Sequence, residues 1–226
     1  MKPIKISPSV LSSDFSRLGE ETKMMDSCKA DMLHLDVMDG NFVPNITFGA
    51  PVIKSIRNCT AMPFDVHLMI NKPLRYIENF RDAGADIITF HVESGSPVAQ
   101  TIERIRATGC AASLSVRPKT DIEEVFPYLD KLAMVLIMTV EPGFGGQSFI
   151  TDTLGKISSL RAECLRRGLN LDIQVDGGIN EQTIVDAAKA GANVFVAGSA
   201  VFNAKQPSQA INNLRRLAKD AFKWSV

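Results

Sequence analysis

Histidine and aspartate residues alternate with apolar residues in two short segments of this sequence. In the segment from Leu33 to Gly40, His34, Asp36 and Met38 fall on one face of an extended chain, and the intervening apolar residues fall on the other. A later segment repeats the pattern with Asp65, His67 and Met69. A buried carboxylate is costly unless it is paired or binds a metal ion. Both segments therefore indicate a polar, chemically active face inside the protein.

A third segment ends in another aspartate, Asp176, which two glycines follow. If the three segments are neighbouring strands that end at the same opening, two imidazoles and two carboxylates converge there. This predicted set of metal ligands consists of His34, Asp36, His67 and Asp176. Mixed nitrogen and oxygen ligands suit one divalent ion of Zn, Fe(II), Mn or Co and do not choose among them. The alternative is a buried network of ion-paired histidines and aspartates. Asp65 is either a partner that orients a ligand or a structural hydrogen-bonding group.

Glycine clusters follow three of the expected strands. They comprise residues 141–147 (Glu-Pro-Gly-Phe-Gly-Gly-Gln), residues 176–178 (Asp-Gly-Gly) and residues 198–199 (Gly-Ser). Glycine lets a backbone approach a ligand closely and present its amide groups. The three clusters predict a phosphate site built mainly from main-chain donors.

The elements that must position these residues recur along the chain as a β-branched run, a loop and an amphipathic helix. This alternation predicts parallel strands with right-handed helical crossovers. The eight expected strands are Ile4–Val10, Asp31–Met38, Pro63–Met69, Asp86–Val92, Ala111–Val116, Ala133–Val140, Leu171–Asp176 and Asn193–Gly198. We therefore expect an α/β fold of the (β/α)8 TIM-barrel class, with residues 1–226 as a single domain. The competing architecture is a doubly wound open sheet.

In such a barrel the functional groups lie at the carboxyl ends of the strands. All three histidines of the chain, His34, His67 and His91, fall near the ends of expected strands. Further along, Thr120 and Glu123 have the spacing of a helix capping box, which predicts a capped helix after the fifth strand.

Bulk composition excludes several classes of function. Among 226 residues, 25 Lys and Arg balance 25 Asp and Glu, so the chain lacks the basic footprint of a nucleic-acid or anionic-membrane binder. We expect no membrane-spanning segment and no signal peptide. The four cysteines form no Cys-x-x-Cys pair, so we interpret them as reduced thiols of a cytoplasmic protein.

Taken together, five motifs resemble those of the ribulose-phosphate 3-epimerase family over nearly the whole chain, from Ser7 to Phe202. They are residues 34–40 (His-Leu-Asp-Val-Met-Asp-Gly), 42–45 (Phe-Val-Pro-Asn), 65–69 (Asp-Val-His-Leu-Met), 138–147 (from Met138 to Gln147) and 175–178 (Val-Asp-Gly-Gly). The resemblance implies a ribulose-phosphate-binding TIM barrel.

The activity that the resemblance implies is the interconversion of D-ribulose 5-phosphate and D-xylulose 5-phosphate in the pentose phosphate pathway. It implies one divalent ion per subunit on the ligands named above, with Asp36 and Asp176 as the acid–base pair, and by analogy a homo-oligomer. The implied substrate and phosphate contacts are Ser9, His67, Gly143, Phe144, Gly145, Gly146, Gly177, Gly178, Gly198 and Ser199. Met38, Met69 and Met138 match the apolar lining of the family, and the alternative is that they are ordinary residues of the barrel core.

Two carboxylates suit this chemistry because inversion at carbon needs a group on each face of a planar intermediate. One carboxylate removes the proton next to the ketone and the other, protonated, returns a proton to the opposite face. The two must therefore hold one proton between them, which titrates as a property of the pair.

The sequence departs from the family pattern at Arg117, where relatives often carry asparagine before a proline, and at Val92, where many carry proline. Both positions are expected near the barrel mouth. The alternative substrate is D-allulose 6-phosphate, on which a sister group acts. The alternative from another class is a non-catalytic sugar-phosphate-binding barrel, which would have no need of the paired aspartates. A Schiff-base aldolase is disfavoured because no expected strand offers an inward lysine at its end.

Overall fold

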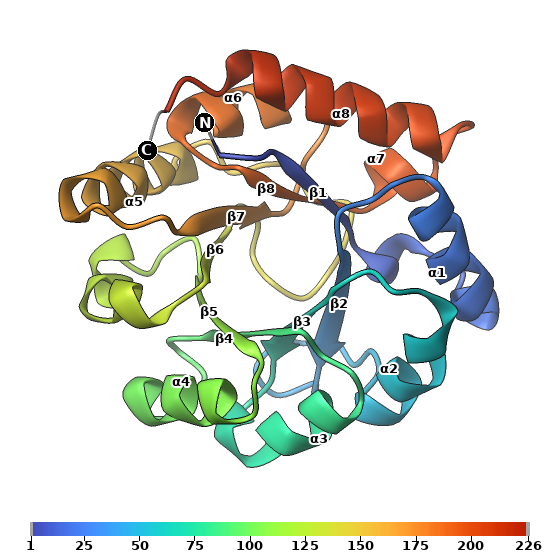
Figure 1. Cartoon of the computed structure of the whole chain (residues 1–226), viewed down its shortest axis with the longest axis horizontal. Coiled ribbons are helices and arrows are strands. Elements are labelled where there is room, and N and C mark those ends of the chain that lie inside the picture. Colours follow the sequence, from blue (N-terminus) through green and yellow to red (C-terminus); the bar gives the residue numbers. More distant parts are fainter. Residues whose placement is uncertain (1, 225–226) are drawn as a thin grey trace.

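Eight parallel strands form the centre of the molecule in a computed structural model, which describes residues 2–224 (Figure 1). The strands are β1 (Lys5–Pro8), β2 (Leu33–Met38), β3 (Phe64–Met69), β4 (Ile87–His91), β5 (Ala111–Val116), β6 (Met134–Met138), β7 (Asp172–Asp176) and β8 (Val194–Ala197). Every expected strand is present, and only the ends differ, by at most two residues. The longer expected runs included flanking residues that lie just outside the strands, such as Val10, which begins a 3-10 helix.

The strands pair in sequential order from β2 to β8, and β8 pairs with β1. A parallel bridge between Ser9 and His34, together with a 3.0 Å hydrogen bond from the amide of Asp31 to the carbonyl oxygen of Ile6, joins β1 to β2 and closes the barrel. The predicted TIM barrel is confirmed, and the doubly wound open sheet is wrong. The extent of the domain over residues 1–226 stays a prediction.

Helices surround the barrel on the outside (Figure 1). The α-helices are α1 (Leu18–Ser27), α2 (Ala50–Ile56), α3 (Ile77–Asp82), α4 (Val98–Ala107), α5 (Thr153–Arg167), α6 (Thr183–Ala190), α7 (Ser199–Phe202) and α8 (Pro207–Ala221). Short 3-10 helices are η1 (Val10–Ser12), η2 (Phe15–Arg17), η3 (Arg57–Cys59), η4 (Pro73–Tyr76) and η5 (Ile122–Lys131). Within residues 2–224, no helix combines the length and the apolarity that crossing a bilayer requires.

The alternation of side chains along β2 places its two faces in different surroundings. Leu33, Leu35 and Val37 are buried in the main apolar core, whereas His34 and Asp36 are buried away from that core, among polar side chains. The same division holds for β3, in which Val66 and Leu68 join the core. The sequence pattern therefore fixes which side chains enter the barrel.

One predicted helix start is wrong. The segment after β5 is the 3-10 helix η5, and the structure shows no side-chain capping bond at its first turn. The hydroxyl of Thr120 instead donates to a carboxylate oxygen of Glu93, which follows β4. Thr120 therefore bonds a residue that is distant in sequence and does not cap the helix.

Candidate active site

The four predicted ligands come together at the carboxyl ends of β2, β3 and β7. One donor atom from each of His34, Asp36, His67 and Asp176 lies within 4.8 Å of the other three. Strand register explains much of this, because Asp36 on β2 is the direct neighbour of His67 on β3. Nδ1 of His67 lies 3.2 Å from Oδ1 of Asp36 and 3.3 Å from Nε2 of His34.

The spacing of these atoms fits a small divalent ion. Oδ2 of Asp176 lies 3.8 Å from Nε2 of His34 and 3.8 Å from Nδ1 of His67. Four ligands at about 2.0–2.2 Å from a central ion in a tetrahedron are about 3.3–3.6 Å apart. The separations that involve a histidine nitrogen, from 3.2 to 3.8 Å, are close to that edge. The cluster is thus a candidate metal site, and its donor set leaves the identity of the ion open.

His34 has a partner that turns one nitrogen toward the site. Nδ1 of His34 lies 2.8 Å from Oδ2 of Asp65, its neighbour in the strand register. Asp65 also accepts hydrogen bonds from Thr89 (3.0 Å) and Gln174 (2.6 Å). An ionised carboxylate only accepts, so Nδ1 of His34 is the donor and Nε2 is aimed at the other ligands.

The site attracts positive charge. Burial opposes protonation of His34, but the charges of Asp36 and Asp65 outweigh it and hold the pKa of His34 well above its ordinary value. Burial and the negative charge of Asp36 raise the pKa of Asp176 to about 6. Burial acts in the same direction on Asp36, but His34 and His67 overcome it and the pKa of Asp36 lies below its ordinary value.

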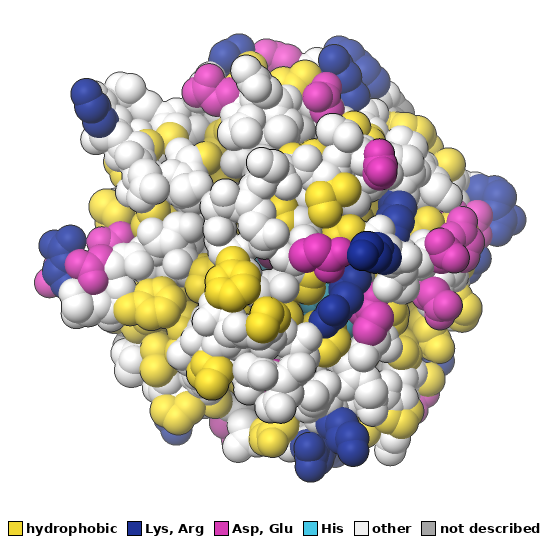
Figure 2. Space-filling view, turned by 180° about the vertical axis from the view of Figure 1, so that it is seen from behind, with side chains coloured by type: hydrophobic (Ala, Val, Ile, Leu, Met, Phe, Trp, Pro, Cys, Tyr) yellow, Lys and Arg dark blue, Asp and Glu magenta, His cyan; other side chains and the backbone are white. Residues whose placement is uncertain are grey.

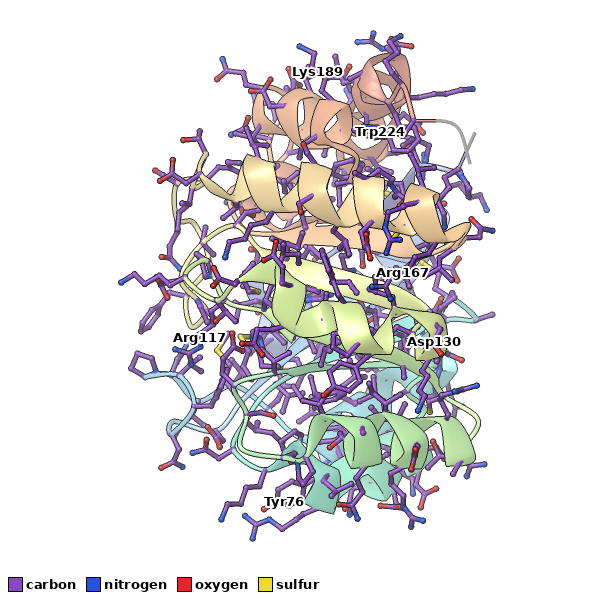
Figure 3. The ribbon with its side chains drawn as sticks, turned by 90° about the vertical axis from the view of Figure 1, so that its left-hand side faces the viewer. Tyr76, Arg117, Asp130, Arg167, Lys189 and Trp224 are labelled. Carbon is purple, nitrogen blue, oxygen red and sulfur yellow. The ribbon has the colours of Figure 1, made fainter. Side chains whose placement is uncertain are left out.

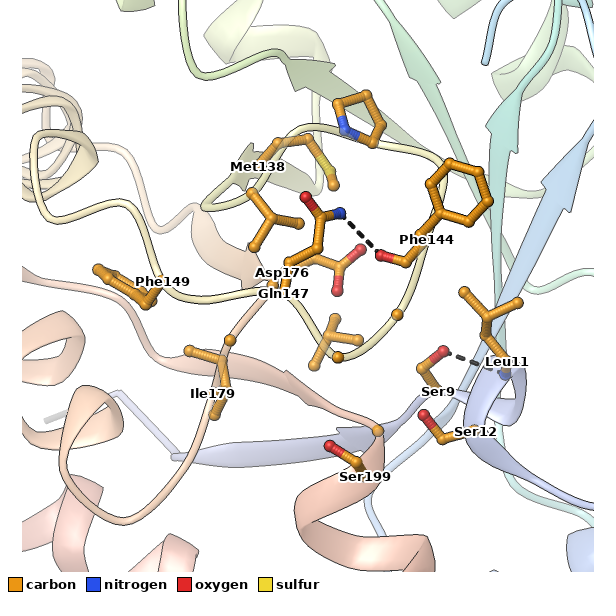
Figure 4. A pocket seen from close by; sticks show the side chains of 18 of the residues that line it. Ser9, Leu11, Ser12, Met138, Phe144, Gln147, Phe149, Asp176, Ile179 and Ser199 are labelled. Carbon is orange, nitrogen blue, oxygen red and sulfur yellow. Dashed lines mark hydrogen bonds between the residues drawn. The ribbon is translucent and has the colours of Figure 1, made fainter. Parts of the chain in front are cut away.

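A cavity of about 610 Å³ opens above the cluster (Figure 4). Asp36 and Asp176 line it, and so do the predicted contacts Ser9, Gly143, Phe144, Gly145, Gly146, Gly177, Gly178, Gly198 and Ser199, with Met38, Met69 and Met138. His67, which is also a predicted substrate contact, is fully buried and is not among the lining residues. All the other predicted site residues except His34 therefore face one cavity.

Hydrogen bonds shape the wall of the cavity. The hydroxyl of Ser9 donates to Oδ2 of Asp36 at 2.6 Å and accepts from the amide of Leu11. In the loop after β6, Nε2 of Gln147 donates to the carbonyl oxygens of Glu141 (2.7 Å) and Phe144 (2.8 Å; Figure 4). These bonds place a carboxylate and a folded glycine loop around the same space.

Two glycines of the expected phosphate end, Gly178 and Gly198, are needed for space. A Cβ on Gly178 would lie 2.4 Å from the amide nitrogen of Phe149, and one on Gly198 would lie 2.4 Å from the hydroxyl of Ser12. Sequence reasoning missed Ser12, which lines the cavity beside Gly198. Its signal was the pair of serines that follows the first strand.

The face that carries the loop after β6 shows no dominant charge. Figure 2 shows Lys and Arg interspersed with Asp and Glu on this face, with hydrophobic side chains gathered beside them. This mixture agrees with the balanced charge of the chain.

Comparison with known proteins decides the family. The model of the ribulose-phosphate 3 epimerase family matches residues 5–202. The chain belongs to this family. It is 49% identical over 216 residues to the ribulose-phosphate 3-epimerase of Synechocystis sp., covering 95% of this chain and 94% of that protein. It is 44% identical to the Escherichia coli K12 ribulose-phosphate 3-epimerase, covering 97% of this chain and 98% of that protein.

Solved structures of more distant proteins share the fold of this epimerase-family chain. The KGPDC of Streptococcus mutans superposes with a TM-score of 0.72 at 12% identity, covering 98% of this chain and 100% of the other. Orotidine 5'-phosphate decarboxylase from Pyrococcus horikoshii gives a TM-score of 0.67 at 15% identity, covering 95% and 99%. These similarities show a shared barrel fold and nothing more.

Proposed function

We propose that this chain is a ribulose-phosphate 3-epimerase that interconverts D-ribulose 5-phosphate and D-xylulose 5-phosphate by proton transfer at C3. The relatives that carry this name align with it over almost their full length. The observation that carries the mechanism is the placement of Asp36 and Asp176. They lie on strands that β1 and β8 separate, and both side chains border the cavity.

Substrate binding would place C3 between these carboxylates. The glycine loops and Ser199 hold the phosphate through main-chain amides and a hydroxyl. The methionines Met38, Met69 and Met138 border the reacting end and keep it apolar. The chain thus fixes the phosphate at one side of the cavity and the reacting carbon at the other.

Proton transfer then needs one ionised and one protonated carboxylate. The opposite pKa directions of Asp36 and Asp176 match this need, because the pair holds a single proton below about pH 6, the pKa of Asp176. One aspartate takes the proton from C3 and the other donates to the opposite face. The hydroxyl of Ser9, bonded to Asp36, fixes the orientation of that carboxylate. The roles exchange when the reaction runs backwards.

We propose that His34, Asp36, His67 and Asp176 hold one divalent ion. When bound, such an ion supplies Lewis-acid stabilisation of the negative charge that develops on the substrate oxygens. The test is exhaustive chelation followed by separate addition of Zn, Mn, Co or Fe(II). We expect loss and recovery of epimerase activity, and full activity in metal-free protein would contradict the metal site.

Self-association into a homo-oligomer and a cytoplasmic location also belong to the proposal. The first rests on family analogy. The second rests on the four cysteines, which are all free and three of which are buried.

A further inference from the structure

A chain of hydrogen bonds leads from the ligand His67 away from the cavity to a carboxylate at the edge of the barrel. Nε2 of His67 lies 2.8 Å from Nε2 of His91, and Nδ1 of His91 lies 3.3 Å from Oε2 of Glu93. Both imidazoles are fully buried, with 5.0 Å between their ring centroids and an angle of 25° between their planes. Neither His91 nor Glu93 lines the cavity, so neither is placed to touch substrate.

The far end of this chain is fixed as an acceptor. Oε1 of Glu93 accepts the backbone amide of Arg117 at 2.9 Å and the hydroxyl of Thr120. Lys156 on α5 holds the same loop, because its Nζ donates to the carbonyl oxygens of Pro118 (2.6 Å) and Thr120. Glu93 therefore has a rigid setting made by β5, its loop and α5.

The direction of each bond follows from that setting. A carboxylate only accepts, so the proton of His91 sits on Nδ1 and its Nε2 carries a lone pair. The nitrogen of His67 that faces this lone pair must then be the donor. Nε2 of His67 therefore carries a proton. In the neutral ring, Nδ1 is then left with the lone pair that an ion held beside Asp36 and Asp176 would take.

We propose that His91 and Glu93 are positioning residues that select the metal-binding tautomer of His67, a role that rests on the metal site proposed above. The arrangement parallels the bond that Nδ1 of His34 donates directly to Asp65, with one imidazole inserted between the ligand and the carboxylate. Partners of this kind fix ring orientation and ligand basicity in metal sites.

The variant Glu93→Gln tests the direction of the bonds at nearly constant shape. The amide of Arg117 can only donate, so the oxygen of the new side chain must occupy the position of Oε1. Its NH2 group then faces Nδ1 of His91 and requires a lone pair there. Nε2 of His91 becomes the donor, and the proton of His67 moves to Nδ1, where it blocks the metal. Glu124→Gln is the matched control, because Glu124 is an exposed residue of η5 to which no side-chain bond is assigned.

The first readout is nitrogen NMR of metal-free protein labelled at histidine, and the three histidines keep the spectrum assignable. We expect Nε2 of His67 and Nδ1 of His91 to carry protons in the parent, and Nε2 of His91 to carry the proton between the two rings in Glu93→Gln. A parent in which Nε2 of His67 carries no proton would overturn the proposal, whether or not the variant folds.

The second readout is the dissociation constant for Zn²⁺, measured by competition with a chromophoric chelator. We expect Glu93→Gln to weaken binding by about 10- to 100-fold and Glu124→Gln to leave it unchanged. If the parent binds Zn²⁺ tightly and Glu93→Gln binds equally well, the role of Glu93 is refuted and the metal site stands. If the parent does not bind Zn²⁺ or any of the other candidate ions, the metal site and this inference are both refuted.

Discussion

Oδ2 of Asp65 lies 2.8 Å from Nδ1 of His34, and the two residues are neighbours in the register of β2 and β3. The alternation of side chains brought both into the barrel, and the parallel register set them side by side. Asp65 is fully buried and accepts three hydrogen bonds. It therefore fixes the orientation of His34, a proposed ligand, without bordering the cavity.

Two replacements of Asp65 distinguish its role in orienting His34 from the effect of its negative charge. We expect Asp65→Ala to weaken Zn²⁺ binding by about 10- to 100-fold. It should also lower the free energy of unfolding by about 1–3 kcal/mol, because buried donors lose their acceptor. Asp65→Asn keeps an oxygen for His34 and Gln174 and should restore most of the affinity. Metal titration and urea unfolding measure both effects, and equal affinities of Asp65→Ala and the parent would remove the orienting role.

The phosphate end can be tested by adding one methyl group at Gly178. A Cβ there meets the backbone of Phe149 at 2.4 Å, and the residue has φ of 66°. We expect Gly178→Ala to raise KM for the sugar phosphate by about tenfold or more, since the loops that bind it must separate. Zn²⁺ affinity should not change.

Gly109→Ala is the matched control, because its φ is 88° and a Cβ there meets no atom within 4 Å. It should cost about 1–2 kcal/mol of stability from backbone strain alone and leave KM at the parental value. Steady-state kinetics and thermal unfolding provide the comparison. A normal KM in Gly178→Ala would exclude its loop from phosphate binding.

His91 predicts a pH dependence of stability. Burial lowers the pKa of His91 to about 4, against an ordinary value of 6.5 in the unfolded chain. Between these values the unfolded chain binds the proton more tightly, so the free energy of unfolding rises with pH. The contribution of His91 amounts to about 3 kcal/mol across that window.

Urea unfolding of metal-free protein across the window checks this expectation. The variant His91→Gln should show a flatter rise than the parent. His34 titrates with the opposite sign but is present in both proteins, so the difference isolates His91. If the free energy of unfolding rose equally with pH in the two proteins, His91 would not be buried as a neutral ring.

Arg117 lies at the mouth end of the barrel, whereas Asp130 and Arg167 lie toward the other end (Figure 3). Its guanidinium donates to the carbonyl oxygen of Phe42 at 2.6 Å and lies 4.2 Å from the centre of that ring. Phe42 in turn packs on His91, with ring centroids 4.9 Å apart. Arg117 does not line the cavity, so its side chain has no assigned contact with substrate.

We therefore expect Arg117→Asn to destabilise the loop after β2 without changing substrate choice. Loss of the hydrogen bond and the cation–π contact should cost about 1–2 kcal/mol. The ratio of kcat/KM for D-ribulose 5-phosphate and D-allulose 6-phosphate should stay that of the parent. A shift of that ratio by about tenfold or more would give Arg117 a role in specificity that the contacts do not show.

The sequence predicted the parts of the site that follow from strand alternation. His34, Asp36 and His67 could be placed because period two and the carboxyl-end rule need only the local pattern and the fold class. The sequence placed His91 near the barrel mouth but indicated no function for it. Its partner Glu93 meets Thr120 only because β4 and β5 are neighbours, and Thr120 had suggested a helix cap instead. Contacts between loops that are distant in sequence could thus not be predicted from the local sequence pattern.

The central claim is that Asp36 and Asp176 act on opposite faces of C3. Proton NMR in deuterium oxide tests it most directly, with metal-loaded parent, Asp36→Asn and Asp176→Asn incubated separately with each pentulose phosphate. The parent should place deuterium at C3 of both epimers while interconverting them. Each variant should lose about 10²- to 10⁴-fold in epimerisation. Each should exchange only the one epimer that its remaining aspartate faces, and the two variants should differ in which epimer that is. Epimerisation by either variant within about tenfold of the parent, or exchange of the same epimer by both, would contradict the two-base account.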